Sequence, residues 1–239
     1  MRLATFSDIH GNLHALQAVL EDIDAQHPDQ VFCLGDLVGY GAYPNEVIEL
    51  IRSRSIPTIM GNYDDGVGFD KDDCGCAYTD PEMKRLGDVS LRWTRDQVTA
   101  ENKAILRSFV PSIRLEAEGK RLLLVHGSPR KINEYLYETR PLHSLERIAQ
   151  MSEADVLVFG HTHLPYVKQV AGVLFVNDGS VGKPKDGDVR AAYALLDIQA
   201  GKVVASIRRV AYDVVAAAAA VRKSGLPPRF ADLLEAASG

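Results

Sequence analysis

Two histidines one residue apart, His161 and His163, follow an apolar run in the segment "DVLVFGHTHLP" at residues 155–165. Four other segments repeat this arrangement, in which a short apolar run is followed at once by side chains that can bind a metal ion. They read "RLATF" before "SDIHGN", "QVFCL" before "GDLVGYG", "IPTIM" before "GNYDD", and "RLLLV" before "HGSPR". The repetition raises the question of whether the five clusters form one site.

The five clusters together offer two carboxylates, one amide oxygen and four imidazoles. These candidate ligands are Asp8, His10, Asp36, Asn62, His126, His161 and His163. One divalent cation takes about four to six ligands of this kind, whereas two cations that share a carboxylate would use all of these groups. The mixture of nitrogen and oxygen favours two transition-metal ions such as Mn, Fe, Co, Ni or Zn over Ca or Mg.

The apolar runs are typical of strands that are buried on both faces. Helical patterns lie between several of them, as in "NLHALQAVLEDIDAQ" and "PNEVIELIRSRS". This alternation predicts an α/β fold with right-handed crossovers and a largely parallel sheet. Ligands of such sheets bind beyond the carboxyl ends of the strands, so we expect the five clusters to meet at one edge.

The rest of the chain predicts three further features within a single domain that covers residues 1–239. A helical insertion lies at about 66–111, with a loop-like start and two helices, of which the second begins at Thr99 or Asn102. This insertion either covers the site as a lid or packs to one side. The segments "GVLFVNDGSVG", "AAYALLDIQAG" and "KVVASIRRVAYD" predict strands that form a second sheet or extend the first, and a helical tail follows at about 213–239.

Composition narrows the class of protein. The net charge is −5 and no basic block is present, which gives no sign of a general nucleic-acid surface. No apolar stretch is long enough to span a bilayer, the first residues lack a signal-peptide pattern, and three cysteines argue against a disulfide framework. We therefore expect a cytoplasmic protein without a membrane partner, whose oligomeric state the sequence leaves open.

The charge of the expected site favours an anionic substrate. Two divalent ions bring four positive charges, of which two aspartates and a bridging hydroxide remove about three. The site therefore stays positive although the chain as a whole is acidic.

The series D-x-H, G-D, G-N-x-D, H-G and G-H-x-H resembles the motifs of the calcineurin-like metallophosphoesterase superfamily. Here it reads "SDIHGN", "GDLVGYG", "GNYDD", "HGSP" and "GHTH", in the family's order. The closer likeness is to compact bacterial and archaeal phosphodiesterase-type members, which share "GDLVGYG", "HGSPR" and "EYL". The resemblance implies a four-layer α/β/β/α sandwich of two mixed sheets with helices outside.

The resemblance also implies a role for each candidate ligand. It assigns one metal ion to Asp8, His10 and His163, and the other to Asn62, His126 and His161, with Asp36 bridging both. The expected activity is that of a metal-dependent phosphoric ester hydrolase, in which a metal-bound hydroxide attacks a small phosphodiester or nucleotide-type substrate, with manganese among the expected ions. The alternatives are a phosphomonoesterase, a dinucleoside polyphosphate hydrolase, a protein phosphatase, or a non-catalytic metal-binding interaction module on the same fold, as in the retromer subunit.

The third motif departs from the family pattern. Many members have a histidine where this chain has Tyr63, and that histidine assists departure of the leaving group. A tyrosine is a poorer acid than imidazole at neutral pH, so we expect the enzyme to favour esters whose leaving group needs little protonation. Asp64 either orients Tyr63 or a water molecule, or caps a helix or turn. The expected catalytic residues are thus Asp36, Asn62, Tyr63 and Asp64.

Three further residues are candidates for contact with the substrate. Asn12 either binds the phosphate or caps the helix that begins there. Arg130 either contacts the phosphate, which suits a guanidinium group, or forms a structural ion pair. Tyr40, between two glycines after Asp36, is expected to line the pocket.

Overall fold

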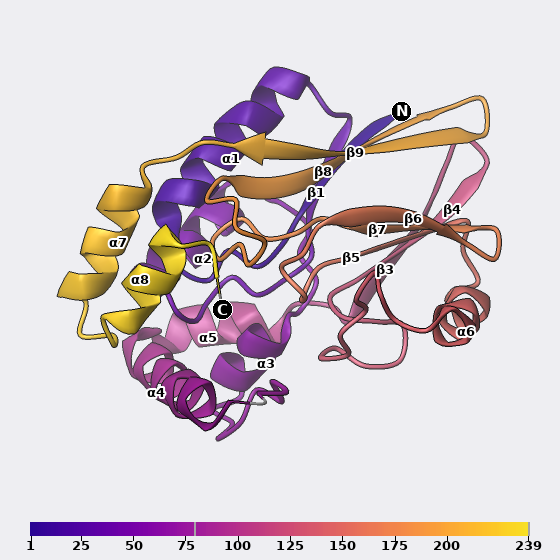
Figure 1. Cartoon of the computed structure of the whole chain (residues 1–239). Helices are drawn as coiled ribbons and strands as arrows, with labels where there is room; N and C mark the ends of the chain where they lie inside the picture. Colours follow the sequence, from indigo (N-terminus) through magenta and orange to yellow (C-terminus); the bar gives the residue numbers. More distant parts are fainter. Residues whose placement is uncertain (79, 239) are drawn as a thin grey trace.

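The computed structural model describes residues 1–78 and 80–238, and in it two mixed sheets pack against each other with helices outside (Figure 1). The first sheet has the strand order β2-β1-β8-β9. Its strands are Arg2–Phe6 (β1), Gln30–Cys33 (β2), Ala191–Gln199 (β8) and Lys202–Val210 (β9). Within it β1 pairs in parallel with β2, whereas the other pairs are antiparallel.

The second sheet has the strand order β3-β4-β5-β7-β6. Its strands are Ser112–Ala117 (β3), Lys120–Val125 (β4), Val156–Phe159 (β5), Tyr166–Val170 (β6) and Val173–Asn177 (β7). The three central strands are parallel, and the two edge pairs are antiparallel. The implied sandwich of two mixed sheets is therefore confirmed. The expectation of a largely parallel sheet is wrong, because β8 and β9 add antiparallel pairs to the first sheet and β3 and β6 add antiparallel edges to the second.

Alternate side chains of the central strands face different layers, as the pleat of a strand requires. In β5, Val156 and Val158 belong to the apolar cluster between the sheets, whereas Leu157 and Phe159 belong to the cluster under helix Leu142–Ser152 (α6). In β1, Leu3 enters the layer between the sheets. Both faces of these strands are buried, which explains their uninterrupted apolar sequence.

Helices cover both outer faces. Helix Leu13–Gln26 (α1) lies on the first sheet and α6 on the second (Figure 1). The remaining helices are Pro44–Ser53 (α2), Asn62–Gly68 (α3), Pro81–Gln97 (α4), Ala100–Arg107 (α5), Val214–Lys223 (α7) and Arg229–Glu235 (α8). Among the described residues, no helix has the length and apolar character that crossing a bilayer would require.

The expected insertion and tail contain the helices that the sequence predicts there. Helix α5 begins after Thr99, whose hydroxyl accepts a hydrogen bond from the Asn102 amide. In this stretch α4 and α5 pack against α2 and α3, and α3 already contains residues 66–68. Residues 79 and 239, which fall within the predicted insertion and tail, lie outside the described residues.

The segment "IPTIM" is not a full strand, which corrects one expectation. It makes only isolated bridges, from Thr58 to Cys33 and from Ile59 to Val110. Pro57 has no amide hydrogen to donate to a ladder, and this limits the pairing of the segment with β2. The polar cluster after it nevertheless reaches the same edge of the sheet, since Ile59 donates from its amide to the carbonyl of Cys33. The sequence analysis did not predict four elements, namely strands β3 and β6 and helices α3 and α6.

The apolar layer between the sheets predicts a large cost for a cavity there. Leu124 is fully buried in that layer, so Leu124→Ala is expected to lower the free energy of unfolding by about 2–5 kcal/mol. The matched control is Val204→Ala, because Val204 is 65% exposed on β9 and should change stability by no more than about 0.5 kcal/mol. Urea titration measures both values, and equal effects would contradict this account of the core.

Candidate metal centre

The loops that follow the strands carry the candidate ligands to one buried place. Asp8 and His10 follow β1, Asp36 follows β2, and Asn62 begins α3. On the second sheet, His126 follows β4, and His161 and His163 follow β5. Each of these seven side chains is no more than 4% exposed. The candidate ligands therefore meet at the carboxyl ends of the strands, as strand order predicts, and strands of both sheets carry them.

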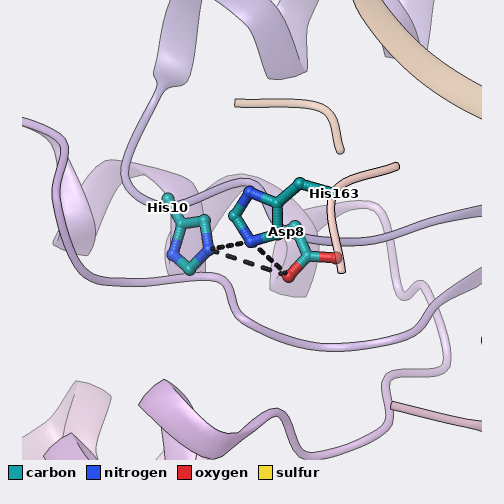
Figure 2. A group of neighbouring side chains, drawn as sticks. All are labelled: Asp8, His10 and His163. Atoms are coloured by element: carbon teal, nitrogen blue, oxygen red, sulfur yellow. Dashed lines mark hydrogen bonds and ion pairs between the residues drawn. The ribbon is translucent and has the colours of Figure 1, made fainter. Parts of the chain in front are cut away.

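The first group consists of Asp8, His10 and His163 (Figure 2). The Nε2 atom of His163 lies 3.2 Å from Oδ1 of Asp8 and 3.2 Å from Nε2 of His10. The Nε2 atom of His10 lies 3.7 Å from the same Asp8 oxygen. The two imidazoles and the carboxylate thus point toward a common centre.

The second group consists of Asp36, His126 and His161, with Asn62 beside it. The Nε2 atom of His126 lies 3.4 Å from Oδ2 of Asp36 and 3.2 Å from Oδ1 of Asn62. The rings of His126 and His161 have their centroids 5.0 Å apart. This arrangement separates the two histidines of "GHTH", because His163 belongs to the first group.

Asp36 lies between the two groups. Its Oδ2 atom lies 3.4 Å from Nε2 of His126 and 3.8 Å from Nε2 of His10. Its other oxygen accepts a hydrogen bond of 2.8 Å from the Tyr63 amide, which fixes the carboxylate. One carboxylate oxygen therefore faces both groups, as a bridging ligand must.

Backbone carbonyls orient three of the imidazoles. Nδ1 of His10 lies 2.9 Å from the carbonyl oxygen of Val38, and Nδ1 of His126 lies 2.7 Å from that of Leu34. Nδ1 of His163 faces the carbonyl of Lys183 in the same way. Each Nδ1–H therefore donates to the backbone, which leaves the Nε2 lone pair aimed into the site.

Hydrogen-bond acceptors consequently face one another without donors between them. The Nε2 atoms of His10 and His163 are opposed, as are Nε2 of His126 and Oδ1 of Asn62. Oδ1 of Asp8 and Nε2 of His161 are buried with no hydrogen-bond partner among the described residues. Converging lone pairs are unfavourable unless a cation lies between them, so the donor set fits two divalent ions of the borderline type.

The pKa values of the histidines agree with this interpretation. Burial lowers the pKa of both His161 and His163 to about 3, so these imidazoles stay neutral and available as ligands. Burial also opposes charge on His126, but Asp36 outweighs it and raises the pKa of His126 to about 10. Without a metal ion, a proton on His126 would thus supply the positive charge that the carboxylate attracts.

Asp64 holds the loop that carries Asp36. Its carboxylate accepts hydrogen bonds from the amides of Asp36, Leu37 and Gly61, at 2.8–3.0 Å. These contacts correspond to the capping alternative of the sequence analysis, and Asp64 contacts the Asp36 backbone instead of the Tyr63 hydroxyl. Asp64 therefore holds the backbone of the Asp36 loop, and its expected catalytic role stays a prediction.

Ser7 and Asp178 form a hydrogen-bonded chain that ends at the Asp8 carboxylate. The Ser7 hydroxyl lies 2.6 Å from Oδ2 of Asp8 and 2.7 Å from Oδ1 of Asp178. Burial raises the pKa of Asp178 well above its usual range. A neutral Asp178 can donate to Ser7, which then donates to the Asp8 carboxylate and keeps its remaining oxygen directed into the site. The sequence analysis missed this pair because neither residue stands out without its neighbours.

Gly160 allows the β5 loop to approach Asp8. The amide of the next residue, His161, donates a hydrogen bond of 2.8 Å to Oδ2 of Asp8. A Cβ atom at position 160 would lie 2.6 Å from that oxygen and still closer to the Ser7 hydroxyl. Only glycine fits here, because the loop after β5 contacts the loop after β1 directly at this point.

A small cavity adjoins both groups of ligands. Tyr40 and Tyr63 line it, in line with the expected place of Tyr40. Asn12 lines a different cavity and caps α1 by accepting from the Ala15 amide, while its NH2 group donates to the carbonyl of Gly182. Asn12 therefore caps the helix, as one of the two alternatives states, and its contact with substrate stays a prediction.

Arg130 also lies away from this cavity. It is 37% exposed and forms an ion pair with Glu134, four residues further along the chain. The structure thus contains the ion pair of the structural alternative, and a contact of Arg130 with the substrate stays a prediction. A guanidinium so engaged would have to leave Glu134 before it could reach a phosphate.

The cavity wall contains four residues that the sequence analysis did not place there, namely Cys76, Tyr78, Tyr135 and Lys185. Cys76 and Tyr78 come from the loop before α4, so part of the insertion contributes to the wall. Tyr135 belongs to the segment "EYL", whose resemblance to relatives was the only signal of its place. Lys185 follows β7 and carries no motif in this sequence.

Comparison with known proteins agrees with the fold. A family model described as the Calcineurin-like phosphoesterase superfamily domain matches residues 1–201. An uncharacterized protein of Methanocaldococcus jannaschii is 34% identical over 94% of this chain and 93% of its own, and phosphodiesterase YfcE of Escherichia coli is 27% identical over 86% and 92%. A metallophosphoesterase structure from Sphaerobacter thermophilus superposes with a TM-score of 0.78, at 31% identity, over 99% of this chain and 100% of that one.

The close approach at Gly160 leads to a prediction about metal affinity. Gly160→Ala is expected to weaken binding of the first metal ion by about tenfold or more, because the added methyl group displaces Asp8 and Ser7. Titration with Mn²⁺ followed by calorimetry measures the affinity. Gly172→Ala is the control: its Cβ meets nothing within 4 Å, but its φ of +85° strains the turn, so stability should fall while metal affinity stays the same. Equal metal affinities in the two variants would contradict the prediction.

Proposed function

The chain belongs to the calcineurin-like phosphoesterase superfamily, and from this premise we propose that it hydrolyses phosphodiester or nucleotide-type substrates with the aid of two divalent metal ions. The observation that carries the proposal is the convergence of seven buried ligands in two groups that share the Asp36 carboxylate. The likeness to phosphodiesterase YfcE supports a diester substrate. All seven ligand positions are filled by residues suited to metal ions, which favours an enzyme over a non-catalytic module.

The proposed reaction assigns separate tasks to residues of the chain. Two bound divalent ions supply Lewis acidity and lower the pKa of water near neutrality, which is the chemistry that phosphoryl transfer needs. Asp36 would bind both ions. Asp8 would supply one oxygen to the first ion, and Asn62 would supply one oxygen to the second. The cavity beside them admits the ester, and Tyr40 and Tyr63 form its aromatic wall.

The first test combines metal analysis with turnover of bis(4-nitrophenyl) phosphate, with Mn, Ni, Fe and Zn each supplied. The wild-type chain should bind two ions and hydrolyse the diester, whereas Asp36→Asn should lower kcat about 1,000-fold or more, because the shared carboxylate is lost. Asp72→Asn is the matched control, since Asp72 is fully exposed and, within the described part of the chain, pairs with Arg95 alone.

Two results would overturn parts of this proposal. Full activity of Asp36→Asn would exclude Asp36 as the shared ligand. Two bound ions without turnover of any phosphoester by the wild type would favour the non-catalytic interaction module. A parallel screen of 4-nitrophenyl phosphate, nucleotides and dinucleoside polyphosphates separates the remaining classes of enzyme.

Tyr63 leads to a prediction about the leaving group. Burial raises its pKa well above the usual range of tyrosine, and its hydroxyl lies 3.4 Å from that of Tyr78. Such a group cannot supply a proton readily, so nitrophenyl esters should be hydrolysed about 100-fold or more faster than alkyl esters of equal charge. Tyr63→Phe should leave this ratio within about threefold, whereas Tyr63→His should narrow it by accelerating the alkyl esters. Comparable wild-type rates on both kinds of ester would show that another acid assists departure.

A further inference from the structure

The segment "KPK" at residues 183–185 brings two lysines to the metal centre from outside the five motifs. Its backbone is fixed against candidate ligands, because the Gly182 amide donates to the carbonyl of Asp8 and the Lys183 carbonyl accepts from His163. Two residues further on, the Lys185 side chain lines the cavity that also contains His10, Asp36 and His161. The position of Lys185 is therefore set by the same contacts that orient the ligands.

Both ammonium groups lack an anionic partner. Among residues 1–78 and 80–238, no carboxylate oxygen lies within 4.0 Å of either, and neither donates a hydrogen bond. Lys183 is only 7% exposed, and its ammonium lies 4.9 Å from the centre of the Tyr40 ring. Burial lowers the pKa of both lysines, because a cation held out of water without a counter-charge is costly unless an anion binds beside it.

Among the described residues that line this cavity, Lys185 is also the one lysine or arginine. The other wall residues outside the ligand set are four tyrosines and one cysteine. Two divalent ions opposite two aspartates leave the site positive, and Lys185 adds one further charge. A phosphoryl group that carries two negative charges matches such a site better than a diester with one.

We propose that Lys185 binds a non-bridging oxygen of the phosphoryl group and favours dianionic phosphoryl groups, as in phosphomonoesters and nucleotide ends, over diesters of equal size. This inference rests on the proposed function, and it shifts the preferred substrate from diesters toward phosphomonoesters and the terminal phosphoryl groups of nucleotides. Lys183 acts as a positioning residue, since its carbonyl orients His163 and its ammonium packs on Tyr40.

The test measures binding of inorganic phosphate to the metal-loaded chain by calorimetry, with metal content determined for every variant. Lys185→Met is expected to weaken phosphate binding about tenfold or more, as loss of a charged hydrogen bond does, while two ions remain bound. Lys185→Arg should stay within about threefold of the wild type, because guanidinium also binds phosphate. Lys202→Met removes an equal charge from an exposed position at the start of β9 and should change nothing.

Turnover provides a second readout. In Lys185→Met, kcat/KM for 4-nitrophenyl phosphate should fall about tenfold more than kcat/KM for bis(4-nitrophenyl) phosphate. Phosphate affinity unchanged in Lys185→Met, or absent from the metal-loaded wild type, would overturn the assignment of Lys185. If the wild type binds phosphate through Lys185 but hydrolyses neither ester, the proposed function fails while the anion site stands.

Discussion

The mutual approach of buried acceptor atoms is the constraint on which the rest of the structure depends. Nε2 atoms of His10 and His163 lie 3.2 Å apart, and Oδ1 of Asp8 faces both without a hydrogen-bond donor among the described residues. Folding brings these lone pairs together only because backbone carbonyls bind the opposite nitrogens of the rings. The chain alone therefore stabilises the orientation of the ligands, and bound cations would relieve the repulsion between them.

The backbone around the site is itself strained. Five of the seven ligands have left-handed φ angles, between 50° and 66°, and these are Asp8, His10, Asp36, His161 and His163. Each such residue costs about 1–3 kcal/mol, and the conformation persists only where neighbouring contacts determine it. One such contact is the hydrogen bond from the Asp36 amide to the Asp64 carboxylate. Another is the close approach of Gly160 to Asp8, which is possible because Gly160 has no side chain. These five ligands thus lie in tight turns that follow strands β1, β2 and β5.

The ligand set could be predicted from the sequence because strand order alone brings strand ends to one edge. Residues whose function depends on contacts across the sheets could not be predicted in this way. The helix cap formed by Asn12 and the ion pair of Arg130 each join residues three or four positions apart in the chain. The sequence could therefore suggest these contacts as alternatives to substrate binding, but it could not choose between the two roles. Lys185 and Tyr78 carry no periodicity or motif, and they reach the cavity only through the path of the loops after β7 and before α4.

The position of the site at the junction of the two sheets links its chemistry to the apolar layer. Asp8, His10 and Asp36 come from the first sheet, whereas the other histidines come from the second. The distance between the two ligand groups is therefore set by the packing of residues such as Leu124 and Leu196 between the sheets. A shift of one sheet against the other would move Asp36 away from His126 and separate the shared ligand from one group. The interior of the sandwich thus acts as the rigid support that a bridging carboxylate requires.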